Sequence, residues 1–220
     1  MINVSISGKL KTKCPNLRLS CIEADVVVCD SDPLLLSKIQ EVTRRISGSV
    51  EMEQISRMPV IHASRVAYKA CGKDPARYRL SAEALLRRVI SGKGLYQINN
   101  VVDQLNLVSI SSGFSIGGYD AERINGSVVF GIGDSGEAYS GIGRGELNIG
   151  NLPVFRDDSG AFGTPTSDSS RTEVSAATHR FLMILIDFGR NDELESATQL
   201  ATELLISHCQ ANNINVLTIE

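Results

Sequence analysis

The sequence contains no tryptophan, and aromatic residues make up only 5% of its 220 residues. Its longest uninterrupted apolar stretch, Phe181 to Ile186, is far shorter than the roughly 20 residues that a membrane-spanning helix needs. The opening residues show no cationic region followed by an apolar run, so we expect no secretory signal. These absences predict a chain that has no membrane segment.

Histidine and paired cysteine are also scarce. The chain has three histidines and five cysteines, and none of them shows the close-paired spacing of a zinc site. The odd cysteine count and the lack of a CxxC pair indicate reduced thiols, and hence a cytoplasmic protein. We expect Cys29, Cys71 and Cys209 to lie in the core, because free cysteine is commonly buried. No metal or other cofactor is predicted.

The composition that remains, 42% apolar and 21% charged, is that of an ordinary globular protein. The length suits a single domain over residues 1–220. A β-branched run over 24–29 predicts a strand, and Asp32 followed by Pro33 predicts the start of a helix that stops near Gly48.

The last forty residues repeat this pattern of strand and helix. The apolar run over 181–186 predicts a strand that is covered on both faces. A helix is expected after Asn191 or Asp192, and a final strand over 214–219. The two strand–helix units predict an α+β (layered α/β) fold in which a mixed sheet is flanked by helices.

The centre of the chain has two parts with different sequence patterns. Residues 59–91 carry helical patterns, with Ser81 as an expected N-cap, and residues 113–163 are rich in glycine. Within the glycine-rich part we expect hairpin strands over 126–130 and 152–156. The GxGxxG run that begins at Gly131 is interpreted as a β-turn, because no helix can follow it to hold a dinucleotide.

Charge is concentrated in one segment. Residues 57–93 hold nine basic residues against two acidic ones, although the whole chain carries a net charge of −3. One interpretation is that these are solvated helix faces; the other is a surface that contacts nucleic-acid phosphates. The RNA-binding candidates are Arg65, Lys69, Arg77, Arg79, Arg87 and Arg88, with Tyr68 and Tyr78 available to stack on bases.

Two polar clusters are candidates for a small-molecule site. The run INNVVDQLN begins at Ile98, and a long polar loop covers 157–172. The alternative is a purely structural role, in which the first run is a capped helix start and the second is a turn held by side-chain hydrogen bonds. The pocket candidates are Asn99, Asn100, Asp103, Asn106, Gly117, Asp158, Thr166, Asp168, Arg171 and Thr172.

These clusters resemble a known family. The INNVVDQLN run, the GFSIGGYD run over 113–120 and the NGSVVF run over 125–130 are similar to the tRNA-binding and editing domain of the bacterial phenylalanyl-tRNA synthetase beta subunit. The runs that begin at Arg65, Asp74 and Ser81 bring the chain closer to free-standing relatives of that domain. The resemblance covers about residues 57–188.

The resemblance implies a function. In the synthetase this domain hydrolyses tRNA charged with the wrong amino acid, which is needed because one pocket discriminates near-isosteres by only about 1–3 kcal/mol. The chain has no ATP site or synthetase core, so it cannot charge tRNA. Gly117 stands where the synthetase has a pocket histidine.

We therefore expect the two polar clusters to fold back around one recess for an amino-acid-like molecule. Asn99, Asn100 and Asp103 would orient the substrate, and Thr166, Ser169 and Thr172 would position a water. The basic segment would hold tRNA. A non-catalytic module that binds tRNA or an amino acid remains an alternative, as does an unrelated hydrolase.

Overall fold

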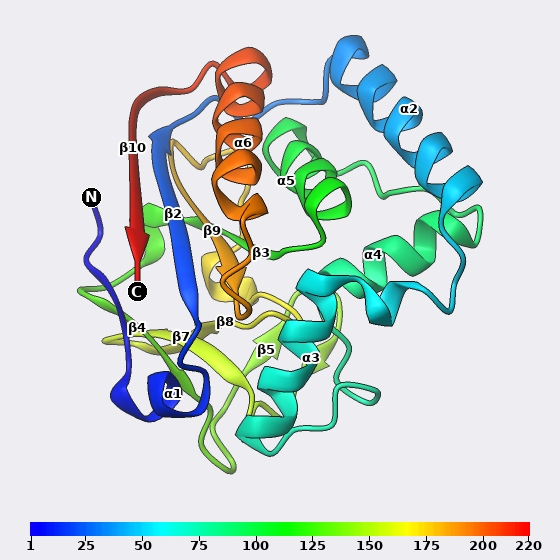
Figure 1. Cartoon of the computed structure of the whole chain (residues 1–220). Coiled ribbons are helices and arrows are strands. Elements are labelled where there is room, and N and C mark those ends of the chain that lie inside the picture. Colours follow the sequence, from blue (N-terminus) through cyan, green and yellow to red (C-terminus); the bar gives the residue numbers. More distant parts are fainter.

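The computed structural model describes all residues from 1 to 220 and contains two four-stranded sheets. The first has the strand order β10-β2-β9-β3, with every neighbouring pair antiparallel. Its strands are β10 (Asn212–Ile219), β2 (Arg18–Asp25), β9 (Arg180–Asp187) and β3 (Ser115–Asp120). In Figure 1, β2 and β9 run side by side through the middle of the molecule.

The second sheet has the order β1-β4-β7-β8. Its strands are β1 (Val4–Ile6), β4 (Val128–Ile132), β7 (Pro153–Asp157) and β8 (Gly160–Gly163). Only β1 and β4 pair in parallel. A small separate hairpin joins β5 (Ser140–Gly141) to β6 (Gly145–Glu146).

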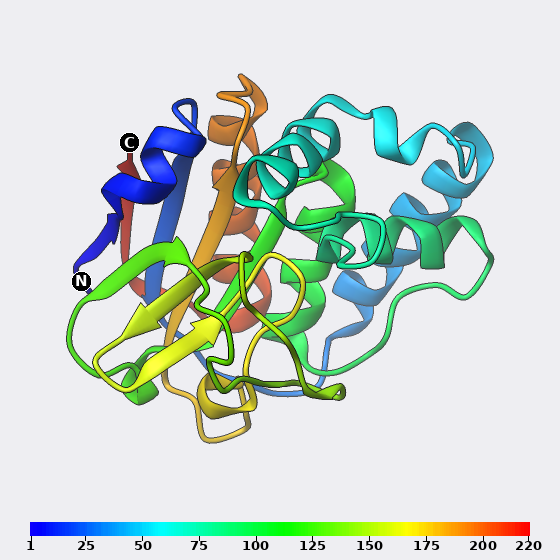
Figure 2. The same cartoon turned by 90° about the horizontal axis from the view of Figure 1, so that it is seen from below.

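Six α-helices complete the fold: α1 (Gly8–Lys13), α2 (Pro33–Ser49), α3 (Pro59–Cys71), α4 (Ser81–Ile90), α5 (Asn100–Ser112) and α6 (Glu193–Cys209). Helices α5 and α6 pack on one face of the first sheet, and the second sheet packs on the other. Figure 2 shows β7 and β8 in yellow in front of β2 and β9.

Strand β9 shows why the layers form. Phe181, Met183 and Leu185 belong to the core shared with α5 and α6, whereas the alternate residues face the core shared with β4, β7 and β8. Every residue from 181 to 187 is buried. Because successive side chains of a strand point to opposite faces, an unbroken apolar run is what a doubly covered strand requires.

Several sequence expectations are confirmed. The α+β class, the helix after Asp32, the doubly covered strand and the C-terminal helix and strand are all present. Asp32 caps α2 by accepting from the amides of Leu34 and Leu35 at 2.8 and 2.9 Å. The hairpin strands predicted near 126–130 and 152–156 are β4 and β7.

Other expectations are wrong. The strand predicted over 24–29 occurs at Arg18–Asp25, and the amides of Val26 and Val27 instead bond to His179 and Cys209 in the connection that follows. Helix α4 begins at Ser81 itself, one residue earlier than a Ser81 cap would place it; Leu80 is the N-cap, and the Ser81 amide, which has no partner within the helix, donates to the carbonyl of Pro165 at 2.8 Å. Cys29 is exposed, whereas Cys71 and Cys209 are buried.

Candidate functional site

The INNVVD run forms the start of α5, and its polar side chains are used internally. Asn99 caps the helix by accepting from the amide of Val102 at 2.9 Å. Asn100 is 1% exposed, and its amide group joins the carbonyls of Val27 and His208 to the amide of Cys29. These bonds hold the connection after β2 and the end of α6 against α5.

Asp103 is also buried within this support. Its carboxylate accepts from the hydroxyl of Ser31 at 2.6 Å and from the amide of Ile98 at 2.9 Å. Asn99, Asn100 and Asp103 line neither of the two cavities that border the 157–172 loop. The structure therefore does not bring them together with Asp168 around one recess, which differs from the arrangement that the sequence led us to expect.

Gly117 packs directly against the aromatic side chain of Tyr119. A Cβ atom at this position would overlap the hydroxyl of Tyr119 and lie 2.5 Å from its Cζ atom, and a Cβ at Gly163 would meet the same hydroxyl from the other side. Tyr119 is fully buried and donates to the carboxylate of Asp168 at 3.0 Å. The phenol of Tyr119 thus fills the space beside Gly117.

The predicted pocket residues of the 157–172 loop differ in their exposure and in their contacts. Asp158 is exposed on the turn between β7 and β8, where its amide donates to Asn125 at 2.9 Å. Thr172 is completely buried, and its hydroxyl has no hydrogen-bond partner. Half-buried Asp168 faces Tyr119, and burial raises its pKa to about 7 despite the hydrogen bonds from Tyr119 and Gly118. Arg171 alone of these borders the larger cavity.

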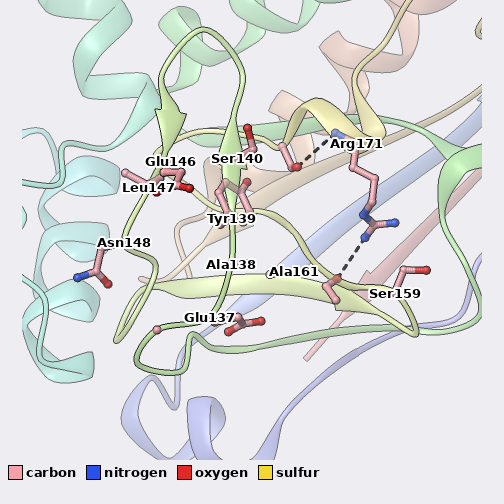
Figure 3. A pocket seen from close by; sticks show the side chains of 13 residues that line it. Glu137, Ala138, Tyr139, Ser140, Glu146, Leu147, Asn148, Ser159, Ala161 and Arg171 are labelled. Atoms are coloured by element: carbon pink, nitrogen blue, oxygen red, sulfur yellow. Dashed lines mark hydrogen bonds between the residues drawn. The ribbon is translucent and has the colours of Figure 1, made fainter.

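This larger cavity has a volume of about 960 Å³ and lies between the segment before β5, the strand β6 and the turn between β7 and β8 (Figure 3). Its lining residues with hydroxyl groups are Ser140, Ser159, Ser169 and Tyr139, of which Tyr139 already donates its hydroxyl to the carbonyl of Ser167 at 2.6 Å. We call it the hydroxyl-rich cavity. The Ser169 oxygen accepts from the amide of Arg171 at 3.2 Å, which leaves its hydroxyl hydrogen free to donate.

The charges around the hydroxyl-rich cavity are unevenly matched. Arg171 forms a two-point ion pair with Asp157 at 2.8 and 2.9 Å, and this pairing lowers the pKa of Asp157 against the effect of burial. Glu137 is paired with Arg156. Glu146 is exposed and has no ion-pair partner. In Figure 3 it lies on the left of the cavity and Arg171 lies on the right. One uncompensated carboxylate therefore borders the cavity.

Part of the positive charge of the basic segment is paired with a single buried carboxylate. Glu83 of α4 is 1% exposed and receives Arg65 at 2.8 Å, Arg87 at 3.1 Å and Arg79 at 3.9 Å. Burying a carboxylate without such partners would be costly. Three of the predicted phosphate contacts are thus already paired with Glu83, and one of them, Arg65, also links α3 to α4.

The two tyrosines of the segment differ. Tyr68 is fully buried, with its hydroxyl 2.9 Å from that of Thr166, so its ring is not accessible to a base. Tyr78 is half-buried, and the ammonium of Lys73 lies 3.8 Å from its ring centre. Lys69 and Arg77 are exposed, and neither forms an ion pair. They remain candidates for contact with RNA.

A second cavity of about 480 Å³ lies along α4. Four sequence candidates meet there: Asn106 and Thr166 from the predicted pocket, and Arg87 and Arg88 from the basic segment. Lys93 and Arg144 add two more positive charges, and no acidic residue lines it. We call it the cationic cavity. Sequence reasoning placed Lys93 in the basic segment but missed Tyr96, Arg144 and Glu146 as site residues, because only the folded chain brings them to these cavities.

The structure contains no group of three or more histidine, cysteine, aspartate or glutamate side chains that could hold a metal ion. None of its helices combines the length and the apolar composition that crossing a membrane requires. The side chains that line the two cavities offer hydroxyl, amide, carboxylate, guanidinium and ammonium groups.

Two packed sheets with helices on the outer face place the chain among layered α+β proteins. Similar in fold is an N-terminal fragment of the phenylalanyl-tRNA synthetase beta subunit from Pyrococcus horikoshii, with a TM-score of 0.50 and 12% identity. The alignment covers 99% of this chain and 54% of that one, so the chain spans about half its length. Among curated protein sequences none matches.

The sequence itself gives the family. Residues 63–210 match the B3/4 domain, and the chain belongs to that family. This agrees with the resemblance to the phenylalanyl-tRNA synthetase beta subunit, since the fold and the family both support a relative of its domain.

Proposed function

We propose that this chain is a free-standing, editing-type domain that binds tRNA and hydrolyses a mischarged aminoacyl ester in the hydroxyl-rich cavity. The family and the fold support the class of domain. A volume of about 960 Å³ is ample for an aminoacyl group together with part of a ribose. Free Lys69 and Arg77 and the cationic cavity offer positive charge for the RNA.

The observation that carries the proposal is the charge balance of the hydroxyl-rich cavity. Arg171 is already neutralised by Asp157, whereas Glu146 has no partner. A free amino acid is a zwitterion and needs a positive group for its carboxylate. An aminoacyl ester has lost that carboxylate and keeps an α-amino group, whose ordinary pKa is about 7.7–8.0. One free carboxylate therefore favours the ester over the free amino acid.

The proposed reaction is simple hydrolysis. Water adds to the ester carbonyl carbon, the bond from that carbon to the ribose oxygen breaks, and the products are the amino acid and tRNA with a free hydroxyl. In the cavity Glu146 would hold the ammonium group, and the hydroxyls of Ser140, Ser159 and Ser169 would orient the water. The rate enhancement comes from the positioning of the ester and the water by these groups, and a neighbouring ribose hydroxyl of the tRNA is available to relay the proton.

A second candidate function is supported by Gly117. The synthetase places a histidine at this position, and here Tyr119 fills the space that such a side chain would need. Asp168 points toward Tyr119 and does not line the cavity, so it supplies no base there. These facts favour a module that binds tRNA or an aminoacyl group without turning it over.

Deacylation assays with a panel of mischarged tRNAs separate these functions. We expect hydrolysis above the uncatalysed background, and Glu146→Gln should lower kcat/KM about tenfold, or roughly 1.4 kcal/mol, mainly at low salt. The matched control is Glu41→Gln, an exposed glutamate of α2. Intact tRNA binding with no rate above background would establish the non-catalytic module instead.

A further inference from the structure

The cationic cavity is built from four separate parts of the chain, one of which is α5, the helix that contributes Asn106. Arg87 and Arg88 lie in the last turn of α4, and Lys93 and Tyr96 come from the connection that follows. Arg144 reaches it from the turn of the β5–β6 hairpin, and Thr166 and Ser167 from the loop after β8. Four positive side chains and several hydroxyl groups therefore face one space.

Three of these four charges have no counter-ion. Arg87 is paired with Glu83, but no carboxylate lies within 4.0 Å of Arg88, Lys93 or Arg144. The Nε atom of Arg88 is buried and has no hydrogen-bond partner. Like charges gathered without acids repel one another, and an anion bound among them would relieve this repulsion.

Phosphate is the anion that fits best. Guanidinium groups bind phosphate oxygens through paired N–H donors, which Arg88 and Arg144 can supply. Several unpaired cations call for more than one negative charge, as in a phosphate monoester or successive diesters. A single carboxylate would leave most of the positive charge unmatched.

An aromatic ring beside the cations points to a nucleotide. Tyr96 is 58% exposed, and the guanidinium of Arg88 lies 3.7 Å from its ring centre. Bases stack on exposed aromatic rings and on guanidinium planes. A volume of about 480 Å³ accommodates one nucleotide and excludes an RNA duplex.

We propose that the cationic cavity is a binding site for the phosphate of a nucleotide, with Arg88, Lys93 and Arg144 as its ligands. The phosphate can belong to a single-stranded segment of RNA or to a free nucleotide. The RNA source rests on the proposed function above, whereas the phosphate chemistry does not.

The test measures the binding of inorganic phosphate, AMP and a short single-stranded RNA at several salt concentrations. Arg144→Ala and Lys93→Ala remove exposed side chains without an ion pair, so the fold is expected to be retained. Each should weaken binding about 3- to 10-fold and reduce the salt slope for RNA by about 0.7. The control is Arg44→Ala on the exposed side of α2.

The three probes distinguish the sources. Weaker RNA binding in both variants assigns the site to RNA phosphates, and an effect confined to phosphate and AMP assigns it to a free nucleotide. If no probe binds more weakly than with Arg44→Ala, the site does not exist. Hydrolysis of an aminoacyl methyl ester, which carries no phosphate, tests the proposed reaction separately and should be equal in all three variants.

Discussion

Asp168 combines burial with two hydrogen bonds, from the hydroxyl of Tyr119 at 3.0 Å and the amide of Gly118 at 3.4 Å. These bonds favour the charged form, but burial dominates and raises the pKa of Asp168 to about 7. In the unfolded chain the same group has an ordinary pKa near 3.9. Between these two values the folded chain holds a proton that the unfolded chain releases.

This difference predicts how stability depends on pH. Because the folded pKa is raised, the contribution of Asp168 is complete below about pH 4 and is lost as pH rises toward about 7. The free energy of unfolding should fall by up to about 1.4 kcal/mol per pH unit across this range.

Denaturant titrations from pH 4.5 to 7.5 provide the measurement. In Asp168→Asn, which keeps an acceptor for Tyr119, the fall in stability should largely disappear. A wild-type chain with the same pH dependence as this variant would show that Asp168 titrates normally.

Gly117 is required by the position of Tyr119. Gly117→Ala should destabilise the fold by about 1–3 kcal/mol, because its Cβ would lie 2.5 Å from the Cζ atom of a fully buried ring. Thermal unfolding measures the loss, with Gly48→Ala, where a Cβ meets nothing within 4 Å, as the control. Adding Tyr119→Phe removes the hydroxyl and should restore part of the stability. Equal melting temperatures for both single variants would refute this packing argument.

At the scale of elements, local signals in the sequence worked well. Asp32 with Pro33 marked the start of α2, Asn99 capped α5 as its residue type suggests, and the apolar run of β9 was doubly covered. Each of these depends on residues a few positions apart. The polar residues of β2 concealed that strand because their partners are distant: Ser20 bonds to Thr198, and Glu23 pairs with Arg180.

The candidate site depended more on distant contacts. Asn100 and Asp103 were predicted to line a substrate pocket, with a capped helix start as the alternative, and their burial against Val27, His208 and Ser31 joins segments far apart in the sequence. Likewise, nothing near Arg144 shows that it would face Arg88. The sequence therefore predicted which types of residue line the cavities better than it predicted which individual residues do so.

At the scale of the whole molecule, β2 is the strand on which both cores depend. It lies between β10 and β9, and it contributes Ile22 to the core beneath the helices and Leu19 to the core between the sheets. The family match begins at residue 63, after this strand. The matched residues alone therefore lack a central part of the fold.

A chain that begins at residue 63 should not fold. Without β2, the strands β9 and β10 lose their common hydrogen-bonding partner, and apolar side chains on both faces become exposed. Far-UV circular dichroism during heating should show a cooperative transition for the full-length chain and none for the fragment. A cooperative transition in the fragment would mean that residues 63–220 contain a sufficient core.

The loop after β8 places neighbouring groups on different sides. Ser167 borders the cationic cavity and Ser169 the hydroxyl-rich cavity, whereas the carboxyl of Asp168 between them turns inward to Tyr119. Inserting or deleting one residue here would move Asp168 away from Tyr119 or shift the two serines away from their cavities. The spacing of this loop is thus under tighter constraint than its composition, and natural variants of the domain should differ there by substitution rather than in length.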